Sequence, residues 1–145
     1  MGLAAKLKNH FFNAFRELFI YHHSSLEFRA SMFALIIAAN ENAGEFEFEI
    51  VTEAGMTIYN DKDRANSLTL TTKEYVQKVR DDNGLDIDIL VHKIVKELKV
   101  IPRYYKKIDI SQLKPILACN NDEETHLYQQ RMLEFLAQTK KDYER

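Results

Sequence analysis

The chain has 145 residues, of which 46% are hydrophobic and 29% are charged. This length suits a single domain, and these proportions exclude a disordered chain, a collagen-like repeat and a coiled-coil rod. Only 4 glycines and 2 prolines are present, too few for the frequent turns of an all-β sandwich or barrel. We therefore predict an all-α fold: a single helical domain over residues 1–145, built as a compact bundle of about six to seven helices.

Net charge and cysteine content limit the kinds of partner that the protein can bind and the cell compartment in which we expect it. Lys and Arg number 20 against 22 Asp and Glu, a formal net charge of −2, so the chain has no general attraction to nucleic acid. The single cysteine, Cys119, excludes an intrachain disulfide and a zinc site with several thiolates, which suits a reducing compartment. The longest apolar run, residues 32–39, is too short to span a membrane. We expect a soluble, cytoplasmic protein that does not bind nucleic acid.

The first predicted element is an amphipathic helix over residues 1–22. Its apolar residues recur at steps of three and four, as in a helix that buries one side. Lys6, Lys8 and Arg16 also fit a helix that lies on a membrane surface. Packing against the core or a protein partner, and docking on a membrane, are both open. The apolar positions are Leu7, Phe11, Ala14, Phe15 and Leu18.

A second helix is predicted to follow, with Ser24 and Ser25 as candidate caps. Its body, residues 28–39, is apolar nearly all round from Met32 onward. A helix that is hydrophobic on every side is a buried one, so we expect this helix at the centre of the fold.

Residues 45–58 allow two interpretations. The alternation of polar and apolar residues over 45–50 is typical of a half-exposed strand. A helix instead places apolar residues four apart on one side and acidic residues in the first turn, where the helix dipole favours them. We favour the helix. The apolar positions on that side are Phe46, Ile50, Ala54 and Ile58.

The next segment is predicted to be a polar loop at residues 60–67, followed by a short helix at 71–80. Thr71 and Glu74 have the spacing of a capping box, which favours a helix start there.

Three more helices complete the prediction. One begins near Asp86, turns its lysines, Lys93 included, away from its apolar stripe, and ends before Pro102. A short helix is expected at about residues 111–118, and a last helix opens at Asp122.

Residues 38–42 and 118–122 show similar sequences eighty residues apart, Ala-Ala-Asn-Glu-Asn and Ala-Cys-Asn-Asn-Asp. Both segments close an apolar helix and precede an acidic turn and another amphipathic helix. We predict two related helix-turn-helix pairs in the fold.

The segment from residue 40 to residue 61 carries acidic residues and no Lys or Arg. On a helix, glutamates four residues apart repel one another by about 0.2–0.5 kcal/mol per pair. A Ca²⁺ or Mg²⁺ ion would offset this repulsion, since both prefer carboxylate and amide oxygens. The alternative is a solvated acidic face that docks basic partners. The predicted metal ligands, from this segment and from the late acidic turn, are Asn42, Glu45, Glu49, Asp122 and Glu123.

No catalytic signature points to an enzyme. Glu123 and His126 form a Glu-x-x-His pair, but a di-iron carboxylate site needs two such pairs and the chain has one. Nucleophile elbows, zinc-protease motifs and glycine-rich phosphate loops do not occur. We therefore predict no catalytic and no cofactor-binding residues.

Residues 93–107 are the basic counterpart of the acidic segment and contain Tyr104 and Tyr105. Basic and aromatic residues together can bind phosphates or single strands, but lysines near a helix C-terminus also complement its dipole. The basic residues are Lys93, Lys96, Lys99, Arg103, Lys106 and Lys107.

The Ala-rich end of the second helix, followed by Gly44, Glu45, Phe46 and Glu49, resembles the acidic turn of the TerB-like tellurite-resistance family. The late turn at residues 121–123 is similar in placement to that family's second acidic turn but lacks its glycine, and Ala43 stands where the family has Asp. The resemblance covers about residues 26–140 by order of elements, which places a TerB-like core at 25–145.

The resemblance implies an all-helical, non-catalytic domain of stress-response proteins, with a divalent-ion site at paired acidic turns. Such domains also occur fused to J-domain co-chaperones. We thus expect a module that binds a divalent cation, a protein partner or both through its acidic turns. The alternative is a metal-free, co-chaperone-type adaptor that docks on protein or, through residues 1–22, on a membrane surface.

Overall fold

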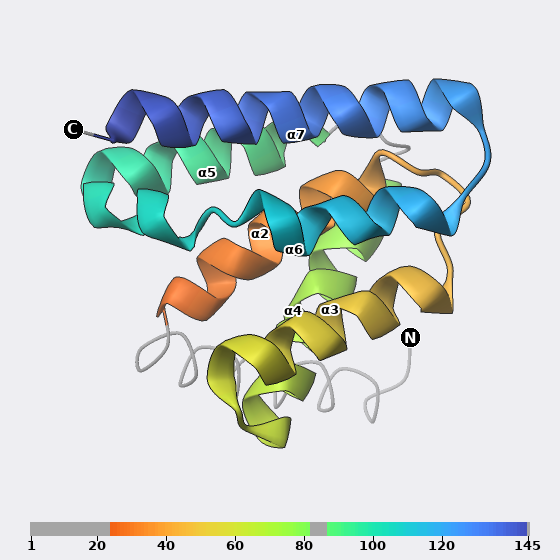
Figure 1. Cartoon of the computed structure of the whole chain (residues 1–145), viewed down its shortest axis with the longest axis horizontal. Helices are drawn as coiled ribbons and strands as arrows, with labels where there is room; N and C mark the ends of the chain where they lie inside the picture. Colours follow the sequence, from red (N-terminus) through yellow and green to blue (C-terminus); the bar gives the residue numbers. More distant parts are fainter. Residues whose placement is uncertain (1–23, 82–86, 145) are drawn as a thin grey trace.

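The computed structural model describes residues 24–81 and 87–144, and these residues form an all-α fold without strands, as predicted. The predicted helix at 1–22 lies outside the described residues. Within the described part, no helix combines the length and the apolar character needed to cross a bilayer. The elements are α2 (Ser24–Ala38), α3 (Glu45–Tyr59), α4 (Lys62–Asp81), α5 (Ile87–Val100), η1 (Pro102–Lys107), α6 (Ile110–Leu113), η2 (Lys114–Cys119) and α7 (Glu123–Tyr143), where η denotes a 3-10 helix (Figure 1).

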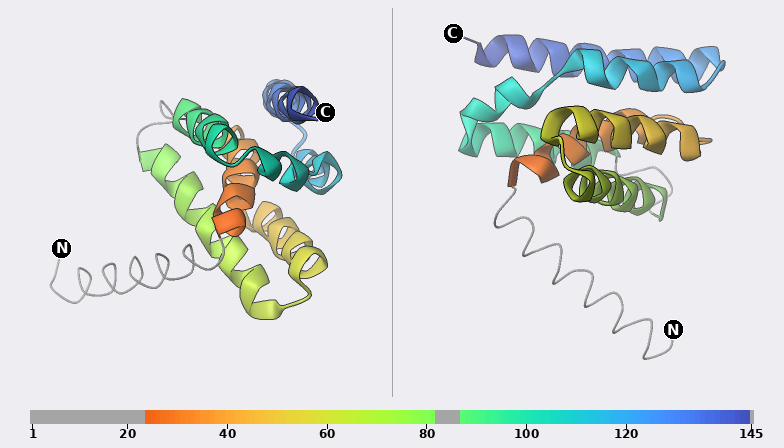
Figure 2. Two further views of the ribbon diagram at one scale, coloured as in Figure 1. Left: turned by 90° about the vertical axis from the view of Figure 1, so that its left-hand side faces the viewer. Right: turned by 60° about the horizontal axis from the view of Figure 1, so that its bottom comes forward.

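Helix α2 is the centre of the bundle, as predicted. Phe28 and all residues from Met32 to Ile37 are buried. The helix packs against α4, α5 and α7, and Figure 2 shows it surrounded by the other helices. Burial on every side from Met32 onward explains why this half of the helix has no polar stripe.

Residues 45–59 form a helix, so the choice of helix over strand was correct. The predicted buried side was correct in part, since Ala54 is buried and Ile50 packs against the core, but it was wrong at Phe46. Phe46 is 74% exposed, whereas Phe48 and Val51 are buried. The rotation of α3 follows from its close contact with α4. A Cβ atom added to Gly55 would lie 2.8 Å from the Cα of Ala65, so only a residue without a side chain lets the two helices approach this closely.

The predicted loop at residues 60–67 was also wrong, because α4 begins at Lys62 and runs for 20 residues. Asn60 ends α3 in the left-handed region, with φ of 50°, and its N–H donates to the Met56 carbonyl at 2.9 Å. Ala65 and Leu68 are fully buried. Their burial stabilises a helix over residues 62–67, although these polar residues have a weak helix propensity and were therefore predicted to form a loop.

In the C-terminal half, α5 and α7 follow the predicted boundaries, whereas the helix predicted at about residues 111–118 is the short α6 followed by the 3-10 helix η2. Helix α5 ends at Val100 before Pro102, and η1, α6 and η2 lead to α7. Asp122 caps α7, since its carboxylate accepts the Thr125 N–H at 2.9 Å. In Figure 1, α7 runs across the top of the bundle, with the turn after η2 at its N-terminal end and η1 near its C-terminal end.

Candidate functional site: an acidic cavity between two turns

The first turn, residues 39–44 between α2 and α3, is held together by the buried side chains of Asn40 and Glu47. Asn40 Oδ1 accepts the N–H of Asn42 at 3.0 Å, and Asn40 Nδ2 donates to Glu47 Oε1 at 3.2 Å. Glu47 Oε2 accepts the N–H of Gly44 at 2.8 Å, as the Glu of a capping box does. Because Asn40 and Glu47 are each 3% exposed, these bonds are shielded from water.

The second turn, residues 120–122 between η2 and α7, is built in the same way. Asn120 Oδ1 accepts the N–H of Asp122 at 3.1 Å, and Asn120 Nδ2 donates to Gln129 Oε1 at 3.2 Å. Gln129 is fully buried and donates to the Ile36 carbonyl at 3.0 Å, which ties α7 to α2. The short sequence similarity at an offset of eighty residues therefore coincides with a shared hydrogen-bonding pattern.

The two turns face each other across one cavity of about 390 Å³. Its charged residues are three acids, Glu41 from the first turn and Asp122 and Glu124 from the second turn and the start of α7. None of the described lining residues is Lys, Arg or His. The cavity is lined by Ala38, Ala39, Glu41, Asn42, Ile87, Asp122, Glu124, Thr125 and Tyr128.

The structure brings together only part of the predicted ligand set. Asn42 and Asp122 line the cavity, but Glu45, Glu49 and Glu123 do not. The Glu45 side chain is 82% exposed and lies 3.9 Å from the Lys73 ammonium. Glu41 and Glu124, which were not in the predicted set, take part instead.

The described residues do not form a cluster of metal-binding side chains. In residues 24–81 and 87–144, no group of three or more His, Cys, Asp and Glu side chains is close enough to hold one. The His126 Nε2 of the Glu-x-x-His pair lies 2.6 Å from the Asn120 carbonyl oxygen, so the ring takes part in the second turn. Three carboxylates and the Asn42 amide line the cavity, so its charge is negative.

Sequence reasoning missed Glu47, the buried acid of the segment. Its neighbours Glu45 and Glu49 are exposed, and composition does not distinguish the three. The position of Glu47 could have identified it, because Glu47 lies three residues after the helix-capping Gly44, where a capping-box glutamate is expected. Burial, and then the nearby Glu47 charge, raise the pKa of the Cys119 thiol, which disfavours the reactive thiolate form.

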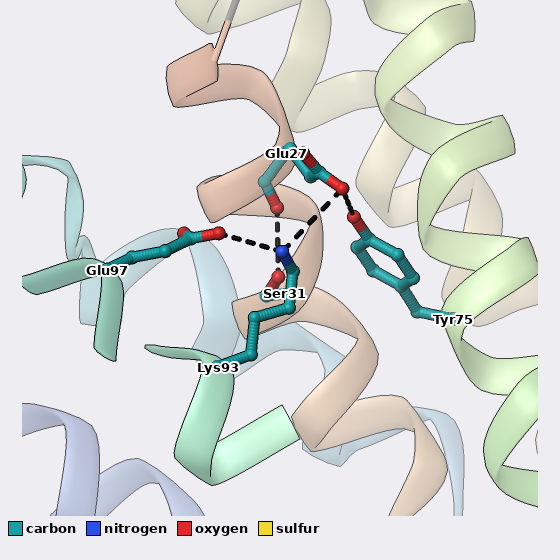
Figure 3. Close-up of polar contacts among 5 residues, drawn as sticks. All are labelled: Glu27, Ser31, Tyr75, Lys93 and Glu97. Atoms are coloured by element: carbon teal, nitrogen blue, oxygen red, sulfur yellow. Dashed lines mark hydrogen bonds and ion pairs between the residues drawn. The ribbon is translucent and has the colours of Figure 1, made fainter. Parts of the chain in front are cut away.

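A second polar cluster joins α2, α4 and α5 (Figure 3). Lys93 was predicted to face away from the core, and this was wrong: its ammonium lies 2.7 Å from Glu97 Oε1 and 3.6 Å from Glu27 Oε1. The Tyr75 hydroxyl donates to the same Glu27 oxygen. Since these contacts connect three helices and Lys93 is already paired twice, we assign the cluster a structural role.

The ionisation of Asp122 can be tested through acid stability. The Thr125 hydroxyl, at 2.7 Å, and the Thr125 N–H hold the pKa of the Asp122 carboxyl below its usual value of 3.8. A group whose pKa falls on folding stabilises the protein above its unfolded pKa, and this contribution is lost as pH falls through the folded pKa.

Asp122→Asn is therefore expected to flatten the acid side of the stability profile. Asparagine also caps helices but has no proton to gain in this range. Urea denaturation from about pH 5 to about pH 2.5 should show the wild type losing stability more steeply than the variant below about pH 4. Parallel profiles would contradict this role of the cap.

Comparison with known proteins gave no relative: no protein-family model, no curated protein and no solved structure matches the chain. The TerB-like resemblance stays a prediction from the sequence.

Proposed function

We propose that this protein is a non-catalytic interaction module that binds a lysine or arginine side chain of a protein partner in the acidic cavity. The observation that carries this proposal is the convergence of Glu41, Asp122 and Glu124 from two separate turns on one cavity whose described lining has no positive charge. A cation from outside the chain would relieve the repulsion among these carboxylates.

The rest of the lining suits a long basic side chain. Ala38, Ala39 and Ile87 provide apolar surface for the methylene stem of a lysine or arginine. The ring of Tyr128, which is 39% exposed, can contact the charged head through a cation–π interaction. The volume also lies within the range of small-ligand pockets, about 300–1,000 Å³.

The TerB-like resemblance suggests the process in which the module acts, namely stress response, and the class of protein to which it belongs, namely co-chaperone-type adaptors. In that setting the module would bring a partner to a larger assembly. No chemical step is part of the proposal.

Binding of the N-acetyl amide of arginine, followed by ¹H–¹⁵N NMR, tests the proposal. The citrulline derivative is a matched probe, since it has nearly the same shape without the charge. We expect the arginine derivative to cause saturable chemical-shift changes in the residues of both turns. The citrulline derivative should cause no saturable changes there. Equal shifts with the two probes would exclude charge recognition, and saturation by Ca²⁺ but not by arginine would favour a metal site instead.

A pair of double variants isolates the cavity carboxylates. Glu41→Gln with Glu124→Gln is expected to weaken arginine binding by about 2- to 30-fold, because each exposed ion pair contributes about 0.2–1 kcal/mol. Glu49→Gln with Glu53→Gln removes the same charge from the exposed side of α3 and should leave the affinity nearly unchanged. Equal losses in both variants would indicate only a long-range effect of net charge.

A further inference from the structure

A largely apolar cavity of about 510 Å³ lies along the exposed side of α5. Ile89, Val100 and Ile101 form its apolar wall, and Ile89 and Val100 are 49% and 72% exposed. A group of large hydrophobic side chains exposed at one place is typical of a surface that another molecule covers. The cavity is therefore a candidate docking surface.

The charge beside this cavity is positive. Lys93 in its lining lies 2.7 Å from Glu97 Oε1, so this pair is neutral. Lys96 and Lys99 are exposed, and within the part of the chain that the structure describes neither forms an ion pair with a carboxylate. Asp88, the exposed acid of α5, lies outside the lining. We name the exposed apolar and basic residues of this side the basic stripe: Ile89, Lys96, Lys99 and Val100.

The exposed side of α3 has the same layout with the opposite charge. Four exposed residues recur along it at steps of three and four, so they share one side of the helix. They are Phe46, Glu49, Glu53 and Met56, which we name the acidic stripe. Neither of the two glutamates is in an ion pair with a described Lys, Arg or His. Each stripe covers about 15 Å of helix, so the two match in length as well as in charge.

We propose that copies of this chain associate through the two stripes, with Phe46 of one copy in the cavity on α5 of another. Phe46 and Val100 are 74% and 72% exposed, the largest fractions among the exposed large hydrophobic residues of the described chain. An aromatic side chain that fills a pocket on its partner is the usual energetic centre of an interface. The glutamates of one copy would then lie opposite the lysines of the other, which favours this pairing over others.

The two stripes lie on separate parts of the molecule. Helix α4 packs against α3 and α2, and α2 packs against α5, so α3 and α5 lie apart in the left view of Figure 2. A contact between two different surfaces is heterologous, and it builds rings or chains of copies unless the two copies contact each other reciprocally. No residue of either stripe lines the acidic cavity, so this association is independent of arginine binding and goes beyond it.

Sedimentation velocity of the full chain tests the proposal. Over a series from about 10 µM to about 1 mM, the range in which small and transient interfaces associate, we expect the average mass to rise above that of a monomer. At a fixed concentration, raising the salt from about 50 mM to about 500 mM should lower this mass, because salt screens the attraction between exposed charges. A chain that stays monomeric over the whole series would overturn the proposal.

Two charge-reversed variants test the stripes themselves. Glu49→Lys with Glu53→Lys makes the acidic stripe basic, and Lys96→Glu with Lys99→Glu makes the basic stripe acidic. Each variant alone should remain monomeric where the wild type associates, because its two stripes then carry like charges. An equimolar mixture of the two variants should associate again, since each reversed stripe meets one of opposite charge. Association that persists in each variant alone, or a mixture that stays monomeric, would contradict the proposal.

Matched variants separate the stripes from net charge. Glu134→Lys with Glu144→Lys, and Lys78→Glu with Lys141→Glu, make the same changes of charge at exposed positions outside both stripes. Both should associate nearly as the wild type does. If they lose association as strongly as the stripe variants, net charge alone controls the association and the stripes have no specific role.

Serine substitutions test the apolar contact. Phe46→Ser should weaken association at least about tenfold, as for the loss of an aromatic anchor, and Val100→Ser should weaken it as well. Leu127→Ser removes a side chain that is 55% exposed on α7, outside both stripes, and should have little effect. Because all three positions are exposed, circular dichroism should show that the variants remain folded. Equal losses in Phe46→Ser and Leu127→Ser would exclude Phe46 as the anchor and, with it, the proposed contact.

Discussion

Glu47→Ala should destabilise the fold by about 2–4 kcal/mol, although its glutamate neighbours on α3 tolerate the same change. The substitution removes the acceptor of two hydrogen bonds, from the Asn40 amide and the Gly44 N–H, at a position that is 3% exposed. Donors that are left buried without an acceptor cost about 1–3 kcal/mol each. Urea denaturation measures the difference, and a melting temperature lower by roughly 3 °C per kcal/mol should accompany it.

Glu49→Ala is the matched control, since it lies two residues further along the same helix and is exposed. Its effect should stay within about 0.5 kcal/mol. Glu47→Gln should fall between the two, because its amide oxygen can still accept from Gly44 while its NH₂ group meets the donor of Asn40. A loss in Glu47→Ala no larger than that in Glu49→Ala would show that water replaces these bonds.

Gly55→Leu should be the second severe substitution, with a loss of about 3 kcal/mol, and Gly55→Ala should lose about 1–2 kcal/mol. In an open helix, Gly→Ala stabilises by about 1 kcal/mol, so the sign of the alanine result is informative. The new Cβ would lie 2.8 Å from the Ala65 Cα and 3.0 Å from the Ala65 Cβ, and neither atom belongs to a flexible side chain. Helices α3 and α4 must therefore move apart.

Gly44→Ala, at the N-cap of the same helix, provides the comparison. No atom lies within 4 Å of an added Cβ at Gly44, and its φ of −131° is accessible to alanine. We expect a loss below about 1 kcal/mol, because alanine is a poorer N-cap than glycine but the N–H that donates to Glu47 is retained. If Gly55→Ala proved as stable as Gly44→Ala, the close approach of α3 to α4 would be wrong.

Local chemistry was enough to predict where several helices begin or end. Pro102 lies just beyond α5, and Asp122 caps α7 with its own side chain. Likewise, the continuous apolar character from Met32 onward predicted that α2 is central, because a helix with no polar side has only the core as a stable environment. These features depend on residues close together in the sequence.

The errors arose where distant contacts decide the outcome. Phe46 and Phe48 are equally apolar, and the packing of α3 against α4, which is close at Gly55 and Ala65, leaves Phe48 buried and Phe46 exposed. The same rotation turns Glu45 and Glu49 outward and Glu47 inward, so two of the predicted metal ligands lie outside the cavity. Lys93 likewise reaches Glu27, a residue far away in the sequence.

The candidate site was predicted in outline and not in detail. The sequence indicated that the turns around Asn42 and Asp122 are acidic, and both residues line one cavity in the structure. Glu41 and Glu124 could not be chosen over Glu49 and Glu123 without knowing how each turn is held. The shape of each turn depends on the buried hydrogen-bond partners of Asn40 and Asn120, which are Glu47 and Gln129.

Because each turn is braced from inside by a carboxamide, the mouth of the acidic cavity should keep its shape when nothing occupies it. A cation would then bind to a preformed site, and its binding would not have to order a loop. Capture should be limited by diffusional encounter, quickened by the attraction of the carboxylates at a distance, and should slow as ionic strength rises.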